Sequence, residues 1–489
     1  MINTRQWFGQ KVSSLLPDTG LLKRLAGFAE APASIDASAK ALSKRSLNER
    51  LQASWSGAGE TLSPRQLRAM LAELEAAADP MISEVEGGRR AGALALWYEQ
   101  ADEGQRLDFC LLLSERFAPD PVAVQEASQR FQQALKEPDQ GQAEIALRRA
   151  LHSPRSRLLQ RFAVFHDGLN FLVGLRAQLL KRLRSDKRLL ALDAELEELF
   201  STWFDVAFLS LERISWDSPA SLIEKLIRYE AVHDIKGWGD VKNRLDSDRR
   251  CYGFFHPQMP KEPLIFVEVA MLDELPDSIL PLLDESAPRV DLTKATTAIF
   301  YSISNTQKGL RGVSFGDSLI KRVVETLKEE FPGLRTFATL SPIPGLRLWL
   351  NEHADDMVRK LDRKAQQDLK EELGASNLDG NAWLSALDNL ASITPDSKVA
   401  QLLMRCAAHY LSQAQADQLP VDPVARFHLS NGARIERLNW AGDPSAKGRK
   451  QSLGLMVNYL YDLKKLDKNR GDFAQGRYAL SGAVSKLGF

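Results

Sequence analysis

Ser341 is the first candidate for chemistry, because the residues that follow it hold it in one place. It begins the string Ser341-Pro342-Ile343-Pro344-Gly345, directly after an apolar stretch typical of a strand. Prolines fix φ and cannot donate to a sheet ladder, so the strand must end there and leave the serine at a rigid strand exit. A hydroxyl held in this way can orient a carboxylate or relay a proton. The alternative is a serine that only begins a turn.

His428 is the second candidate. It lies in the string Phe427-His428-Leu429-Ser430-Asn431-Gly432-Ala433-Arg434. An Asn-Gly pair is a strong hairpin signal, so we expect His428 on a strand just before the turn. An imidazole there can donate a hydrogen bond or move a proton near neutral pH. The alternative is a histidine that is merely packed or solvated.

A glycine-rich loop at residues 307–317 is the third feature with chemical potential. An apolar strand at 297–303 leads into it, an amphipathic helix at about 318–331 follows, and another strand is expected at 334–340. Glycines let the backbone approach a ligand closely, and unpaired N–H groups at a helix start favour an anion, so this order favours phosphate binding. Plain turns use glycines in the same way, and the string matches neither a Walker loop nor the dinucleotide fingerprint.

The elements that must position these residues change type along the chain. Residues 1–190 show many helical segments and little strand signal, whereas 251–255 and 264–269 are typical of two strands paired around a proline-containing turn. We therefore predict a two-domain α+β protein. An all-helical N-terminal domain should occupy residues 1–190, and a mixed α/β domain should occupy residues 191–489.

Bulk composition excludes several kinds of partner. The 489 residues carry 64 Lys plus Arg and 64 Asp plus Glu, so no net field attracts nucleic acid or an anionic membrane. No apolar run approaches the roughly 18 residues that cross a bilayer, so we expect a soluble protein.

Three cysteines without a Cys-x-x-Cys pair, and histidines without ligand spacing, predict neither disulfides nor a metal, which fits a cytoplasmic location. Residues 1–28 are basic like an organelle transit peptide, although we expect an ordinary surface helix there.

Several strings together resemble the malonyl-CoA decarboxylase family. The resemblance covers residues 160–465 well and the first 150 residues only loosely. The strings that carry it are Leu211-Glu212-Arg213 with Trp216, Glu230-Ala231-Val232-His233, Arg250-Cys251-Tyr252, Ala298-Ile299-Phe300-Tyr301-Ser302-Ile303-Ser304, Leu319-Ile320-Lys321-Arg322-Val323-Val324, Ser341-Pro342-Ile343-Pro344-Gly345, Asp422-Pro423-Val424-Ala425, Phe427-His428-Leu429 and Asn431-Gly432-Ala433.

The resemblance implies a fold, a reaction and an assembly. The helical domain would mediate assembly into a homotetramer, a dimer of dimers, and the second domain would have the GNAT acyltransferase fold and bind malonyl-CoA. The reaction would remove CO2 from malonyl-CoA and leave acetyl-CoA. No cofactor is expected, because the thioester itself accepts the electron pair as an enolate and the CoA moiety belongs to the substrate.

The resemblance also implies the site residues. Ser341 and His428 match the catalytic serine and histidine, and Tyr461 matches an active-site tyrosine. The loop around the CoA pyrophosphate matches Arg311, Gly312, Val313, Ser314, Phe315, Gly316 and Asp317. Ser314 departs from relatives that carry a glutamate there, which leaves open what supports the histidine. Lys308 and Arg311 could pair with phosphate, or both could be solvated.

Two other functions would also use a CoA-binding chain. A GNAT-type N-acyltransferase would need an amine-binding groove and a base, and the sequence offers neither. A non-catalytic acyl-CoA sensor is a function that the large helical half could serve. Such a sensor would tolerate alanine at Ser341 and His428.

Overall fold

The computed structural model describes residues 45–313, 319–388, 393–412 and 419–488. The chain forms two compact units. One contains Met1–Phe204 and Gln307–Ser314, and the other contains Asp205–Thr306 and Phe315–Phe489. The chain therefore leaves the second unit at Thr306, contributes a short segment to the first, and returns.

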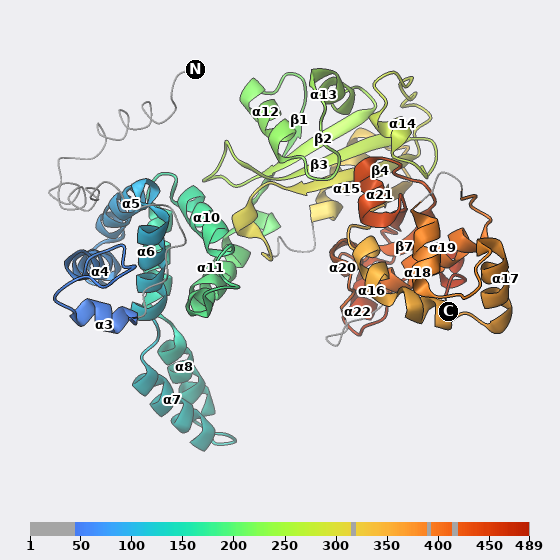
Figure 1. Ribbon diagram of the computed structural model, residues 1–489. Coiled ribbons are helices and arrows are strands. Elements are labelled where there is room, and N and C mark those ends of the chain that lie inside the picture. The colour runs from blue at the N-terminus through green and yellow to red at the C-terminus, as the bar shows by residue number, and fades with distance from the viewer. Residues whose placement is uncertain (1–44, 314–318, 389–392, 413–418, 489) are drawn as a thin grey trace. The chain divides into compact units, whose positions relative to one another are not determined.

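The first unit is helical (Figure 1). Ser46, Ser63 and Asp102 each begin a helix with a capping box, in which the cap and the third residue satisfy each other's backbone N–H groups. Aromatic rings pack in its core, where Phe162 and Phe171 stack with centroids 5.2 Å apart. Its elements are α3 (Leu47–Gln52), α4 (Pro64–Ala78), α5 (Glu84–Gln100), α6 (Glu103–Arg116), α7 (Pro121–Gln133), α8 (Gln140–Leu151), α9 (Pro154–Val164), α10 (Gly168–Leu179), η1 (Lys187–Leu189), α11 (Leu190–Trp203) and η3 (Lys308–Leu310).

The second unit is built on an eight-stranded sheet with the order β1-β2-β3-β4-β5-β8-β6, and β7 also pairs with β8. All neighbours are antiparallel except β4 and β5, which helix α15 (Leu319–Glu330) connects as a parallel pair. The strands are β1 (Ser210–Ile214), β2 (Arg249–Phe255), β3 (Pro263–Leu272), β4 (Thr297–Asn305), β5 (Thr336–Thr339), β6 (Ser341–Pro342), β7 (Arg434–Asn439) and β8 (Met456–Leu460). The predicted helical unit, mixed sheet unit and strand–helix–strand order are confirmed.

Helices cover both faces of this sheet. Cys251 and Phe266 pack with Leu226 of α12, whereas the preceding residue of β2, Arg250, points the other way and pairs with Glu330 of α15. The remaining elements of the unit are η2 (Val206–Phe208), α12 (Ala220–Tyr229), α13 (Trp238–Arg244), α14 (Leu280–Leu283), α16 (Leu346–Arg359), α17 (Arg363–Leu373), α18 (Gly380–Leu387), α19 (Lys398–Ser412), α20 (Pro423–Ser430), α21 (Ala446–Ser452), α22 (Leu466–Phe473) and α23 (Gly482–Ser485).

The pairing between β4 and its neighbour stops where β5 ends. β4 pairs with β5 only from Thr297 to Phe300, and in the described part of the chain no strand pairs with its remaining residues on that side. β5 meets β8 at one residue pair, Ala338 with Leu460, before β6 continues along β8. The result is an open stretch of β4 edge, residues 301–305, next to the break between β5 and β6. Ser341 begins β6, so the prediction that the strand ends at this serine is wrong, because Pro342 still pairs with Met456 of β8.

The prediction that His428 lies on a strand is wrong. It lies in the last turn of α20, which begins with Asp422 as N-cap and Pro423 in its first turn, a strong helix-start combination. The Asn-Gly pair ends this helix, with Gly432 at φ 84°, and strand β7 begins only at Arg434. A left-handed glycine closes a helix as readily as it forms a hairpin.

Candidate active site

Ser341 is buried at the start of β6, and a neighbouring threonine fixes its hydroxyl. Ser341 Oγ donates to Thr339 Oγ1 at 2.8 Å. Thr339 Oγ1 also accepts the backbone N–H of Tyr459 at 3.2 Å, so the threonine is itself held by β8. Because residues two apart on an extended chain point to the same side, the sequence order Thr-Leu-Ser brings these two hydroxyls together.

His428 reaches the serine from α20. Its Nε2 lies 3.3 Å from Ser341 Oγ, and its Nδ1 lies 2.7 Å from Tyr461 Oη. The imidazole also stacks on Tyr459, with ring centroids 4.5 Å apart and planes tilted by 27°. Both ring nitrogens and one ring face are therefore in contact with protein, which fixes the orientation of the imidazole.

These contacts form one directional chain of hydrogen bonds. Since Ser341 donates its proton to Thr339, its oxygen is left to accept from His428 Nε2–H. A neutral imidazole with its proton on Nε2 accepts at Nδ1, so Tyr461 donates there. The protons therefore point in sequence from Tyr461 to His428, Ser341 and Thr339, and each bond polarises the next.

Burial keeps the groups of this chain uncharged. Desolvation lowers the pKa of His428 to about 3, so the imidazole is neutral at physiological pH. Desolvation also raises the pKa of Tyr461 and that of Tyr459 far above the usual phenol value. The chain therefore works through oriented hydrogen-bond donors and not through a resting ion pair.

Further polar groups hold the strands around the serine. The side-chain amide of Asn458 on β8 donates to the backbone oxygen of Thr339 at 2.9 Å. Asn439 on β7 donates in turn to Asn458 Oδ1 at 2.8 Å. Asn439 and Asn458 are buried, and their bonds tie β5, β7 and β8 together where the ladder is interrupted.

The helix that carries His428 begins at a buried carboxylate. Asp422 Oδ1 accepts the backbone N–H groups of Val424 and Ala425 at 2.9 and 2.8 Å. Burial raises the pKa of Asp422 to about 6, against the opposing effect of those two N–H groups. Asp422 thus anchors α20 at the end opposite to His428.

The predicted CoA loop is described only in its first three residues. Arg311, Gly312 and Val313 belong to the segment that packs in the helical unit, and Gly312 has the left-handed φ of 84°. Ser314, Phe315, Gly316 and Asp317 lie outside the described residues, as do residues 1–28.

Sequence reasoning missed Thr339, Tyr459 and Asn458. Strand alternation could have indicated the first two, because each lies two residues before a predicted site residue, Ser341 or Tyr461. Nothing local indicates Asn458, whose role depends on the pairing of β8 with β6 and β7.

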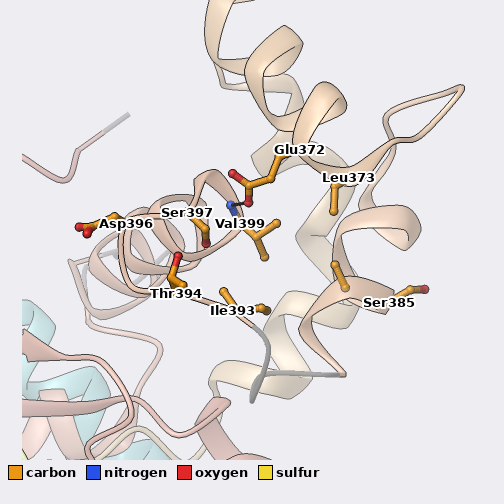
Figure 2. A pocket seen from close by; sticks show the side chains of 9 residues that line it. Glu372, Leu373, Ser385, Ile393, Thr394, Asp396, Ser397 and Val399 are labelled. Carbon is orange, nitrogen blue, oxygen red and sulfur yellow. Dashed lines mark hydrogen bonds between the residues drawn. The ribbon is translucent and has the colours of Figure 1, made fainter.

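A separate cavity of ≈ 610 Å³ lies among α17, α18 and α19 (Figure 2). Glu372 projects into this region and accepts the backbone N–H groups of Lys398 and Val399 at the start of α19. Its carboxylate is occupied by that helix cap, and neither Ser341 nor His428 lines the cavity. We therefore locate the candidate site at Ser341 and not here.

Two features are absent from the part of the chain that the structure describes. In that part of the chain, no three or more His, Cys, Asp and Glu side chains gather in a way that could hold a metal ion. Over the same residues, no helix is long and apolar enough to cross a membrane.

The fold and the site together indicate a two-unit protein whose buried hydroxyl and imidazole can donate hydrogen bonds and transfer protons. A helical unit precedes a mixed-sheet unit, and the sheet carries a buried, neutral tyrosine–histidine–serine chain suited to hydrogen-bond donation and proton transfer. Comparison with known proteins narrows this class. The family model "Malonyl-CoA decarboxylase C-terminal domain" matches residues 207–487, and "Malonyl-CoA decarboxylase N-terminal domain" matches residues 117–204.

Relatives and solved structures agree with both matches. The chain is 36% identical to the mitochondrial malonyl-CoA decarboxylase of Anser anser anser and 37% identical to that of Mus musculus, each over 400 residues; these cover 78% of this chain and 79% and 81% of the relatives. The crystal structure of malonyl-CoA decarboxylase from Cupriavidus metallidurans is 44% identical with a TM-score of 0.72, covering 86% of this chain and 100% of that one. The structure from Rhodopseudomonas palustris is 40% identical with a TM-score of 0.74, covering 86% and 99%. This chain therefore belongs to the malonyl-CoA decarboxylase family, and the resemblance stated from its sequence is confirmed.

Proposed function

We propose that this protein converts malonyl-CoA to acetyl-CoA and CO2 at Ser341, His428 and Tyr461. The observation that carries the proposal is the buried hydrogen-bond chain that ends on the Ser341 hydroxyl, in a member of this family. The relatives' names support malonyl-CoA as the substrate, and the chain of donors supports the chemistry proposed below.

In the proposed reaction, the bond between the carboxylate carbon and Cα of the malonyl group breaks. Its electron pair moves into the thioester, CO2 leaves, and the thioester oxygen becomes an enolate oxygen. Cα then takes up one proton, which comes ultimately from solvent, and becomes the methyl group of acetyl-CoA. The catalyst must therefore stabilise a developing oxyanion and exclude water from it.

Ser341 supplies the hydrogen bond in this proposal. Its hydroxyl turns from Thr339 to the developing enolate oxygen, while His428 Nε2–H continues to donate to Ser341 Oγ. A hydroxyl that accepts a hydrogen bond is a stronger donor, so the chain through Tyr461 and His428 strengthens the bond to the enolate. The neutral imidazole can serve this purpose because its pKa is so low.

We further propose that the acyl-CoA binds along the open edge of β4. Residues 301–305 of β4 have no strand partner on the β5 side among the described residues, so their amides can bond to the amides of an extended pantetheine arm. This edge leads along the chain into residues 311–317, the proposed pyrophosphate loop. The GNAT-like assignment of the sheet unit, with the helical unit serving assembly, is part of the same proposal.

The basicity of His428 favours this reaction over N-acyl transfer. An N-acyltransferase removes a proton from an amine, and an imidazole with a pKa of about 3 is a poor base for that step. A non-catalytic sensor would need no directional donor chain, and its acyl-CoA response would survive Ser341→Ala.

The test uses purified protein and malonyl-CoA in deuterated water, after dialysis against EDTA and without added metal or cofactor. We expect acetyl-CoA with one deuterium in its methyl group, and an initial rate about 10²-fold lower in Ser341→Ala and in His428→Ala. Ser430→Ala is the matched control, because among the described residues its hydroxyl bonds only to the Phe427 oxygen of the same helix, α20.

Each other outcome has a definite meaning. Binding of malonyl-CoA by folded protein without turnover would refute the decarboxylase and favour a sensor. Turnover that survives both alanine variants would keep the reaction and refute the site. Activity that EDTA abolishes and a metal restores would refute the cofactor-free mechanism.

We also propose a homotetramer, a dimer of dimers, in the cytoplasm. α7 and α8 pair with each other, and α8 buries none of its residues within the described chain, which leaves its apolar side chains for a second copy. Sedimentation equilibrium should give the mass of four chains, and a monomer at micromolar concentration would contradict this.

A further inference from the structure

Residues 307–313, the described part of the link between β4 and α15, pack in the helical unit. The η3 turn lies on α10, and Gly309 approaches so closely that a Cβ there would collide with the backbone oxygen of Val173. Only glycine fits at this position. The start of the proposed pyrophosphate loop is therefore bound to a helix that is far away in the sequence.

Arg176 of α10 holds this segment by hydrogen bonds to its backbone. Its Nη1 donates to the backbone oxygens of Gly309 and Arg311 at 2.9 and 2.8 Å. Its Nε donates to Asp193 at 2.9 Å and its Nη2 to Glu197 at 2.7 Å. Arg176 is only 1% exposed, so these bonds are shielded from water.

The backbone carbonyl of Arg311 belongs to a type II turn. Arg311 has φ −60° and ψ 129°, Gly312 has φ 84°, and Val313 N–H donates to Leu310 oxygen at 3.1 Å. In a trans peptide the C=O and the following N–H point in opposite directions. Because Arg176 holds the oxygen of Arg311, the N–H of Gly312 points away from Arg176.

That N–H is available to a ligand. The Val313 N–H bonds within the turn, and the N–H groups of Leu310 and Arg311 donate to the oxygens of Gln307 and Lys308, whereas Gly312 N–H bonds to no described residue. A type I turn would rotate the Arg311–Gly312 peptide and lose the bond to Arg176. A backbone N–H without a partner in the described structure is a hydrogen-bond donor, and phosphate oxygens are strong acceptors for such a group.

We propose that Arg176 is a positioning residue for acyl-CoA binding, which holds the Arg311–Gly312 peptide so that Gly312 N–H faces the CoA pyrophosphate. This inference rests on the proposed function, because the loop is assigned to CoA there. It gives Arg176, a residue of the helical unit, a role that is separate from assembly.

Arg176→Lys tests it, since lysine keeps the charge and loses the planar fork that holds two carbonyls and two carboxylates. We expect the KM for malonyl-CoA to rise about tenfold with kcat changed less than about twofold. Malonyl-pantetheine lacks the pyrophosphate, so its kcat/KM should be the same in the parent and the variant.

Arg155→Lys is the matched control. Arg155 is 3% exposed, donates to the backbone oxygens of Leu113, Ser114 and Ala191, and pairs with Glu195 in the same unit. It makes no bond to the loop in the described structure, so its variant should leave KM unchanged. An equal rise in KM in both variants, or an equal loss with malonyl-pantetheine, would overturn the proposal.

Two further measurements keep the test decisive. If Arg176→Lys does not fold, Gly312→Ala should raise KM in the same way, because alanine disfavours the φ of 84° that the turn requires. If the parent does not decarboxylate malonyl-CoA, calorimetry with CoA tests this inference separately from the function. Arg176→Lys should then bind CoA about tenfold more weakly than the parent, and equal affinity would overturn the inference.

Discussion

In the described part of the chain, the hydrogen-bond partners of His428 are two uncharged hydroxyl groups, and neither is a carboxylate. Burial is the cause of its low pKa, and the partner of Nδ1 is a phenol. In a serine–histidine–aspartate triad a carboxylate at this position stabilises the imidazolium that forms when serine loses its proton. A neutral tyrosine instead fixes the tautomer and leaves the serine proton in place. The residue types at this site therefore suit hydrogen-bond donation better than nucleophilic attack.

Tyr461→Phe tests this role. The variant leaves Nδ1 without a donor, so the Nε2–H tautomer loses its support, and we expect kcat to fall about 10- to 100-fold with KM little changed.

The folded pKa of His428, about 3, lies below the ordinary value of 6.5, so the ring stays neutral as pH falls from 8 to 5. The pH profile of kcat should therefore show no loss near pH 6.5 in the parent. A limb near 6.5 that disappears in Tyr461→Phe would contradict this account.

The sequence could supply the identities of these residues but not their partners. Ser341 and His428 lie in strings that resemble the family, the same resemblance implies Tyr461, and the proline pair after Ser341 also predicts a strand exit. Their connection spans 87 residues between serine and histidine and 33 between histidine and tyrosine. Contacts over such separations depend on the fold of the whole sheet unit.

At the scale of elements, the sequence predicts the sheet better than the helix that carries the histidine. Residues 251–255 and 264–269 fall within β2 and β3, and α15 follows its predicted range closely. The Asn-Gly signal is ambiguous, because a left-handed residue closes both hairpins and helices. Asp422 and Pro423 resolve the ambiguity in favour of a helix.

Asp422→Asn tests how α20 is anchored. The folded pKa of Asp422, about 6, exceeds the ordinary 3.8, so the folded state binds more protons and the parent loses stability as pH rises from 4 to 6. Asparagine also accepts the two helix N–H groups and carries no charge. We expect the variant to match the parent at pH 4 and to exceed it at pH 7 by on the order of 2 kcal/mol in urea unfolding. A variant that is less stable at pH 7 would show that the charge itself is needed.

At the scale of the whole molecule, the half of the chain after residue 204 contributes one segment to the first unit. Helices in the first 190 residues and strands from about 250 are predictable because each has a local period. The packing of Gln307–Ser314 with residues before 205 is not, since a glycine pressed against the backbone of a remote helix leaves no local pattern. The family models divide at the same place, between residues 204 and 207.

The packing of this segment predicts that the two halves of the chain associate when they are expressed separately. If residues 1–204 and 205–489 are expressed together as separate chains, the second carries the segment that packs in the first unit, so the two should purify as a 1:1 complex. Gly309→Ala places a Cβ against the backbone oxygen of Val173 and should weaken that complex on gel filtration. Gly237→Ala is the control, because its backbone is extended and nothing lies within 4 Å of an added Cβ. Halves that remain together equally well in both variants would show that other contacts join them, and halves that never associate would contradict the packing of this segment.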